Sequence, residues 1–207
     1  MTMDKPEVEA VGGSNANVEE FGLTLPELEG QAVRRYYSAA RTILEYGSGG
    51  STVLAARAGS SIISVESDRD WAERLSAHLA PISRKARVHY VDVGLTGAWG
   101  TPKNAQGHRN FHAYALSVWD RADFKAPDVV LIDGRFRASC LVAIRLRATR
   151  PTTVLFDDYL NRTHYHGVEA LADLEEMIGR MARFTVTPGP IPPEMMTAAV
   201  GWFADSR

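Results

Sequence analysis

The sequence predicts an α/β protein: a three-layer sandwich around a mostly parallel seven-stranded sheet with an antiparallel C-terminal edge. Short apolar segments, read as strands, alternate with amphipathic segments, read as helices. This alternation is typical of a parallel sheet covered on both faces. Two strand-like segments at the C-terminus have no helix between them, which indicates antiparallel pairing. A glycine cluster follows the first strand and indicates ligand binding there.

Composition excludes several other classes of protein. The 207 residues are 45% hydrophobic and 23% charged, which is globular and argues against a disordered, collagen-like or coiled-coil chain. The net charge of -2 predicts no nucleic-acid partner and no attraction to an acidic membrane. A single cysteine, Cys140, excludes an internal disulfide framework and fits a reducing compartment. The polar N-terminus and short apolar runs predict a soluble, cytoplasmic protein.

The chain is expected to form one domain, 21–207, after a mobile N-terminal leader, 1–20, that has few large apolar residues. Pro26 and Glu27 suit the first turn of a helix. Other predicted helices end at glycine or proline, as at Gly59 and Pro81. The predicted helices are 25–40, 51–58, 70–79, 137–148 and 168–181. The predicted strands are 42–46, 61–66, 87–91, 128–132, 152–156, 184–187 and 197–203.

One long segment, about 94–125, interrupts the alternation of strands and helices. It is rich in glycine, proline and asparagine, and 112–119 within it has the character of a helix. An excursion of this length in a compact domain is usually a lid, a binding loop or an oligomer contact. We therefore expect it to form part of a substrate pocket.

The most informative segment is Leu44–Thr52, where a glycine cluster joins the first strand to a helix. Such a turn lets the backbone approach a ligand closely, and the helix behind it offers unpaired N–H groups. Glu66 ends the next strand, where an acid commonly accepts hydrogen bonds from ribose hydroxyls. Together these features predict a site for a cofactor that contains adenosine. The alternative is a glycine turn that serves only strand–helix geometry.

The type of cofactor follows from what surrounds the glycines. The dinucleotide fingerprint needs a glycine at its sixth position, where this chain has Thr52, and the lysine of a phosphate-binding loop is also missing. Glu45 adds a negative charge, which suits a cationic amino-acid ligand better than a pyrophosphate. A nicotinamide oxidoreductase is therefore disfavoured.

The segment Leu44–Thr52 resembles motif I of the class I S-adenosylmethionine (SAM)-dependent methyltransferases, and the resemblance extends over about 43–203. It implies a Rossmann-like fold and SAM as cofactor. Glu66 stands at the position of the family's ribose-binding acid, and Asp92 at that of a residue near the adenine. Ser51 departs from the third glycine that many members carry. The cofactor-binding residues implied are Glu45, Gly47, Ser48, Gly49, Ser51, Glu66, Asp92 and Asp133.

Three aspartates follow the fourth and fifth predicted strands: Asp133, Asp157 and Asp158. The carboxyl ends of neighbouring parallel strands share one crevice, so these acids are expected to converge. Three carboxylates repel one another unless they are protonated or bound to a cation, and hard oxygen ligands suit Mg²⁺. The alternative is that they cap helices and contact the amino group of SAM without a metal.

The same acids resemble the metal ligands of catechol-type and macrocin-type O-methyltransferases. That resemblance implies that Asp133, Asp157 and Asp158 bind Mg²⁺, which would lower the pKa of a substrate hydroxyl. The catechol-type enzymes carry a lysine where this chain has Phe136, so the base would be the metal alkoxide or a histidine. His166 is preferred over His164 for that role.

The expected activity is SAM-dependent methyl transfer to a hydroxyl oxygen of a small molecule. The catalytic candidates are Asp133, Asp158 and His166. Arg135 and Arg137 stand at the mouth of the crevice, where they could clamp a carboxylate or phosphate or pair with Asp133. Two alternatives stay open: a metal-free methyltransferase and a SAM- or adenosine-binding protein without catalysis. Members of the family often dimerise, which makes a homodimer an option.

Overall fold

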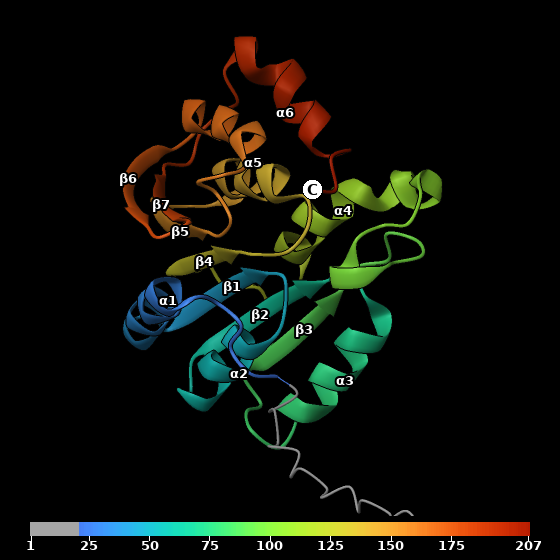
Figure 1. The fold of residues 1–207 in the computed structure, drawn as a ribbon, viewed down its shortest axis with the longest axis vertical. Coiled ribbons are helices and arrows are strands. Elements are labelled where there is room, and N and C mark those ends of the chain that lie inside the picture. The colour runs from blue at the N-terminus through green and yellow to red at the C-terminus, as the bar shows by residue number, and fades with distance from the viewer. Residues whose placement is uncertain (1–20) are drawn as a thin grey trace, which may run out of the picture.

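The computed structural model describes residues 21–207, so the predicted leader 1–20 lies outside the described residues. Seven strands form one sheet in the order β3-β2-β1-β4-β5-β7-β6 (Figure 1). Neighbouring strands from β3 to β5 pair in parallel, whereas β7 is antiparallel to both β5 and β6. This confirms the predicted Rossmann-like α/β fold. The strands are β1 Thr42–Tyr46, β2 Ser61–Glu66, β3 Ala86–Tyr90, β4 Val129–Ile132, β5 Thr152–Phe156, β6 Asp173–Ile178 and β7 Met181–Val186.

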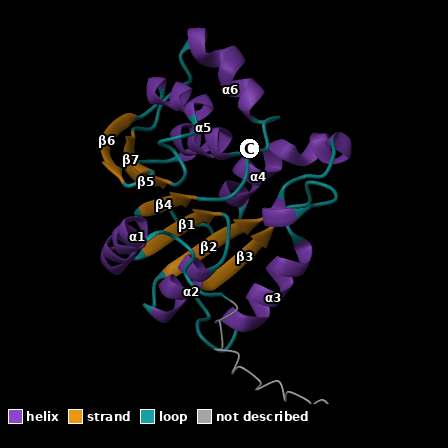
Figure 2. Cartoon of the chain, in the orientation of Figure 1, coloured by secondary structure: helices purple, strands orange, loops and turns teal. Residues whose placement is uncertain are grey.

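Helices cover both faces of the sheet (Figure 2). Alternate side chains of each strand point to opposite faces, so Ile43 packs in the core beneath one face and Leu44 in the core beneath the other. The first core includes side chains of α1 Glu27–Ala39, α2 Gly50–Arg57 and α3 Arg69–Leu79. The second core includes side chains of α4 Phe111–Leu116, α5 Arg137–Arg147 and α6 Met196–Trp202.

The predicted helix 168–181 is wrong. A 3-10 helix, Thr163–Ala170, is followed by the hairpin of β6 and β7. The residues whose spacing suggested a helix do not share one buried face. Leu171 and Met181 are buried, whereas Leu174 is 42% exposed on the edge strand. Gly179 has a φ of 58°, a left-handed conformation suited to glycine, and it forms the tight turn between the two strands.

The predicted last strand, 197–203, is also wrong, because this segment forms α6. Pro192 and Pro193 introduce a short 3-10 helix before it, and the alanines that follow favour a helix. Trp202 and Phe203, expected to pack in a strand, instead lie at the end of α6 and pack on the second core. The antiparallel edge exists, and β6 and β7 form it.

The excursion 94–125 contains short helical segments rather than strands. These are the 3-10 helices Ala98–Gly100, Ala105–Asn110 and Ser117–Asp120, together with α4. The predicted helix 112–119 therefore corresponds to α4 and the 3-10 turn after it.

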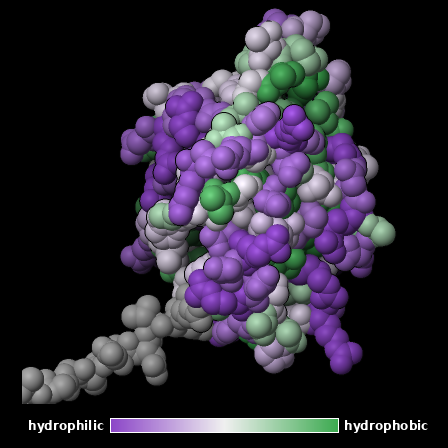
Figure 3. Space-filling view, turned by 90° about the vertical axis from the view of Figure 1, so that its right-hand side faces the viewer, coloured by the Kyte–Doolittle hydropathy of each residue, from purple (hydrophilic) through white to green (hydrophobic). Residues whose placement is uncertain are grey.

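Hydrophilic side chains dominate the face shown in Figure 3. Within the described part of the chain, every helix is too short or too polar to cross a bilayer.

Candidate functional site

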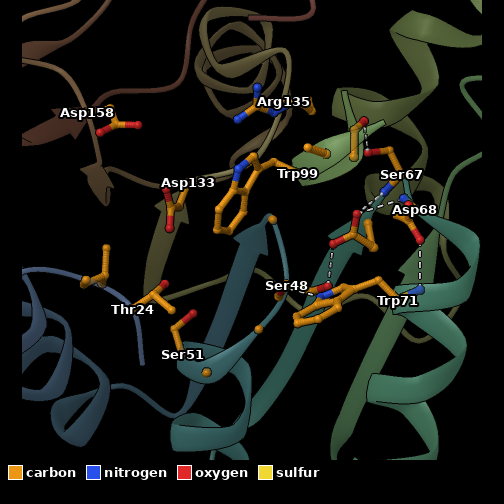
Figure 4. Close-up of a pocket in the computed structure, with 18 of the residues that line it drawn as sticks. Thr24, Ser48, Ser51, Ser67, Asp68, Trp71, Trp99, Asp133, Arg135 and Asp158 are labelled. Atoms are coloured by element: carbon orange, nitrogen blue, oxygen red, sulfur yellow. Dashed lines mark hydrogen bonds between the residues drawn. The ribbon is translucent and has the colours of Figure 1, made fainter. Parts of the chain in front are cut away.

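A cleft with a volume of about 770 Å³ opens at the carboxyl ends of the parallel strands (Figure 4). The loops after β1, β2, β4 and β5 all contribute to its walls. Two further segments, 21–25 before α1 and 97–100 in the excursion, also contribute to the lining. The cleft lies where open α/β sheets bind ligands.

The glycine loop after β1 is closely packed against two other parts of the chain. Gly47 has a φ of 97°, and a Cβ added to it would lie 2.7 Å from the backbone nitrogen of Gly134 after β4. A Cβ on Gly50 would collide with the carbonyl of Gly22 in the segment that precedes α1. Glycine is therefore needed at both positions, by conformation at Gly47 and by close approach at both.

Glu45 lies beneath this loop rather than in the cleft. Its buried carboxylate accepts hydrogen bonds of 2.5 Å from the hydroxyls of Tyr37 and Thr52, and it is not among the cleft-lining residues. Burial raises its pKa to about 7. The Thr52 hydroxyl also accepts from the backbone N–H of Gly49 at 3.0 Å. Glu45, predicted to bind the cofactor, is thus placed where it supports the loop from below.

Glu66, at the end of β2, faces the cleft with its carboxylate firmly held. It accepts hydrogen bonds from the Ser48 hydroxyl at 2.7 Å and from the backbone N–H groups of Ser67 and Asp68 at 2.7 and 2.9 Å. The indole N–H of Trp71 donates to the Ser48 carbonyl at 2.8 Å, which fixes the loop beside it (Figure 4). Burial raises the pKa of Glu66 against these hydrogen bonds. The site therefore offers a fixed acceptor for hydroxyl groups.

Asp92 is placed outside the residues that line the cleft. It is exposed, and its carboxylate accepts a hydrogen bond from the Gly94 N–H at 2.9 Å. The segment 97–100 approaches Glu66 instead, since the Ser67 hydroxyl donates to the Gly100 carbonyl at 2.9 Å. Next to it, Trp99 lines the cleft with 82% of its surface exposed and a left-handed φ of 59°. The sequence suggested either a partly apolar substrate or core packing for Trp99, and the structure places this indole in the cleft.

The three predicted aspartates converge. Asp133, Asp157 and Asp158 each offer a carboxylate oxygen, and these oxygens lie within 4.8 Å of one another. Asp133 and Asp158 line the cleft, whereas Asp157 is fully buried behind them. Burial raises the pKa of Asp133 to about 7; the charges of Asp157 and Asp158 act in the same direction, and Arg137 opposes them.

Three arginines surround these acids, and two of them were not singled out from the sequence. Arg137 is buried, with its Nη2 atom 3.3 Å from Asp133 Oδ1 and 3.2 Å from Asp158 Oδ2. Arg162 lies 2.6 Å from Asp158. Arg180, from the β6–β7 hairpin, lies 2.6 Å from Asp157 and 3.2 Å from Asp158.

The contacts of these arginines with the three aspartates bear on whether the acid cluster can bind a metal ion. Three guanidinium groups balance three carboxylates, and each of the three acids has an arginine nitrogen within 3.3 Å. A Mg²⁺ ion would have to displace these partners, because it needs the same oxygens at close range. The residues in this arrangement do not fit a magnesium site, and we derive no step through one.

The structure does not bring the predicted histidines into the cleft. Neither His164 nor His166 is among the residues that line it. The His166 ring stacks on Tyr159 with a centroid separation of 4.7 Å, and its Nε2 atom lies 3.2 Å from the Tyr159 carbonyl oxygen. His166 is therefore occupied in local packing.

Comparison with solved structures identifies similar proteins. A methyltransferase-like protein from Silicibacter pomeroyi is 43% identical; the match covers 90% of this chain and 98% of that one, with a TM-score of 0.85. An O-methyltransferase from Bacillus cereus, solved with S-adenosylhomocysteine (SAH), is 16% identical over 79% of this chain and 82% of that one, with a TM-score of 0.54. A methyltransferase from Geobacter sulfurreducens is 13% identical over 79% and 80%, with a TM-score of 0.52. The last two show a shared fold alone. No protein-family model and no curated protein matches the chain.

Proposed function

Because the chain belongs to the class I SAM-dependent methyltransferases, we propose that it transfers the methyl group of SAM to a hydroxyl oxygen of a small molecule. The observation that carries this proposal is the single cleft that joins the fixed carboxylate of Glu66 to the carboxylate of Asp133. The carboxylate of Glu66 suits the hydroxyls of a ribose, and the carboxylate of Asp133 lies where a methyl acceptor could reach it. The SAH complex of the Bacillus cereus O-methyltransferase, which has the same fold, supports the choice of cofactor.

In this proposal the residues around the glycine loop hold SAM. Glu66 accepts hydrogen bonds from the ribose hydroxyls, because its remaining acceptor capacity faces the cleft. Gly47 and Gly49 let the backbone approach the ligand, and the serine side chains of Ser48 and Ser51 line the same wall. Bound SAM supplies an electrophilic methyl group on a cationic sulfur.

The chain's own contribution to the chemistry is to orient the acceptor and to take its proton. The acceptor oxygen forms a bond to the methyl carbon as the carbon–sulfur bond breaks, and the hydroxyl proton passes to Asp133. Asp133 is suited to this role because it lines the cleft and its pKa lies close to neutrality. Asp158 orients the acceptor beside it, and Arg137 holds both carboxylates. Most of the rate enhancement comes from positioning.

Metal assistance by Mg²⁺ stays a prediction from the sequence, and the arginine contacts favour the metal-free form of the reaction. A SAM-binding protein without catalysis is the remaining alternative. The acids in the cleft favour transfer over that alternative, since a carboxylate beside the cofactor loop provides a proton acceptor.

Calorimetric titration of SAM into the wild-type protein and Glu66→Gln tests the proposal. We expect saturable binding to the wild type and at least about tenfold weaker binding to the variant, which loses a charge-assisted acceptor. Glu73→Gln, an exposed position on α3 away from the cleft, serves as the matched control and should bind like the wild type. Absence of SAM binding by the wild type would contradict the proposal. SAM binding without SAH production from any hydroxyl-bearing acceptor would favour the non-catalytic alternative.

A further inference from the structure

Arg135 differs from the three arginines that surround the acid cluster. It lines the cleft, yet no carboxylate among residues 21–207 forms an ion pair with it. Its Nη1 atom lies 3.3 Å from the Thr101 hydroxyl, and its buried Nε atom has no hydrogen-bond partner in the described chain. The guanidinium group therefore has a donor, the Nε–H, that residues 21–207 leave unsatisfied.

The backbone that carries Arg135 is fixed. Its N–H donates to the hydroxyl of buried Tyr114 at 3.3 Å. The next residue, Phe136, has a left-handed φ of 53° with its ring fully buried. Such a conformation is costly for a residue other than glycine and persists only where its surroundings enforce it. The turn thus directs the Arg135 side chain toward the cleft, on the side of Trp99 (Figure 4).

The local charge favours an anion at this position. Burial, together with the charge of Arg137, lowers the pKa of Arg135. The acids of the cluster already pair with Arg137, Arg162 and Arg180, so among residues 21–207 none of them pairs with the positive charge of Arg135. The Arg135 guanidinium group lines the cleft, so a carboxylate or phosphate oxygen bound there can form charge-assisted hydrogen bonds with it.

We propose that the methyl acceptor carries a carboxylate or phosphate group that Arg135 binds, with the indole of Trp99 against the acceptor's apolar body. Trp99 supplies an exposed aromatic surface in the same cleft, and an apolar ligand would cover it. This inference rests on the proposed methyl transfer, because it names the chemical class of the acceptor. The carboxylate of SAM itself is the competing anion, and the test separates the two.

The experiment titrates benzoate, phenyl phosphate and the neutral benzamide into protein saturated with SAH. We expect at least one of the two anions to bind the wild type about tenfold or more tightly than benzamide, since hydrogen bonds to charged groups have effects of this size. Arg135→Gln should abolish this preference while its SAH affinity stays within about twofold of the wild type. Arg109→Gln removes the same charge from an exposed position of the excursion that does not line the cleft, and it should keep the preference.

The outcomes distinguish this inference from the proposed function. Equal binding of the anions and benzamide by the wild type, or no binding of either anion, would overturn the assignment of Arg135. A loss of SAH affinity in Arg135→Gln as large as the loss of anion affinity would assign Arg135 to the cofactor instead. Failure of the wild type to bind SAH would contradict the proposed function itself. The stronger of the two anions identifies the acceptor's group as carboxylate or phosphate.

Discussion

The buried carboxylate of Glu45 accepts a hydrogen bond from the hydroxyl of Thr52, seven residues further along the chain. Thr52 in turn accepts from the Gly49 N–H, so one side chain links the end of β1 to the glycine loop. Tyr37 of α1 donates to the other oxygen of Glu45. The loop that faces the cleft is therefore held from beneath by a buried acid, and its stability depends on the ionisation of that acid.

The first prediction concerns the pH dependence of stability. Burial raises the pKa of Glu45 from 4.5 to about 7, so between these values the folded protein holds a proton that the unfolded chain has lost. The Glu45 contribution to the free energy of unfolding therefore falls as pH rises from 4.5 to 7. Glu45→Gln mimics the protonated form and should lack this fall. The free energy of unfolding of Glu45→Gln, measured relative to that of the wild type, should therefore rise by on the order of 3 kcal/mol between pH 5 and pH 8.

Urea unfolding of both proteins at the two pH values measures this difference. Glu73→Gln, on the exposed face of α3, controls for the loss of a carboxylate as such. A difference between Glu45→Gln and the wild type that does not change with pH would show that Glu45 titrates normally in the folded protein.

The second prediction concerns Arg180, which carries the countercharge of fully buried Asp157. Arg180→Met should leave that carboxylate unpaired and destabilise the protein by about 2 kcal/mol, less than a fully buried pair because Arg180 is 40% exposed. Adding Asp157→Asn should recover part of the loss, because the double variant has no uncompensated charge. Chemical denaturation of the two single variants and the double variant gives the coupling free energy. If the losses of stability in the two single variants add up in the double variant, the interaction between Arg180 and Asp157 contributes nothing to stability.

The positions of the first five strands and of the glycine loop could be predicted from local pattern, because buried parallel strands are short apolar runs with clear ends. The C-terminal segment could not. The edge strand β6 is exposed along most of its length, so it has no alternation of buried and exposed residues to reveal it. Leu171, Leu174, Ile178 and Met181 have helical spacing by coincidence.

The incorrect helix prediction for 168–181 also explains why an arginine of the acid cluster was missed. Convergence of Asp133 and Asp158 follows from the rule that parallel strand ends share a crevice. Arg180 pairs with Asp157 and Asp158 from the turn of the β6–β7 hairpin, and a segment predicted as helix gave no reason to place it there. Arg162 is four residues beyond Asp158 and lies in a loop, where spacing alone does not imply an ion pair. Of the three cations that balance the acid cluster, the sequence therefore indicated Arg137 alone.

The third prediction concerns Asp92. The family resemblance assigns it to the adenine, whereas the structure places it outside the cleft with its carboxylate bound to the Gly94 N–H. We expect Asp92→Asn to bind SAM within about twofold of the wild type, because an asparagine oxygen can accept the same hydrogen bond. Calorimetric titration of SAM, with Glu66→Gln as the positive control for lost affinity, provides the measurement. A tenfold loss of SAM affinity in Asp92→Asn would show that Asp92 contributes to the cofactor site.

The fourth prediction concerns magnesium. Asp133, Asp157 and Asp158 are each bound by an arginine, so Mg²⁺ titrated into the wild-type protein should produce no saturable heat, and chelators should not change SAM binding. Replacing both Arg162 and Arg180 by glutamine would leave two of the three negative charges unbalanced and free their oxygens. That double variant should gain a calorimetric response to Mg²⁺, because three clustered carboxylates with excess negative charge favour a hard divalent cation. Arg109→Gln with Arg84→Gln, two exposed arginines away from the cleft, removes the same charge and should gain none. Saturable Mg²⁺ binding by the wild type would show that the arginines yield to the metal, and it would restore the metal-assisted reaction predicted from the sequence.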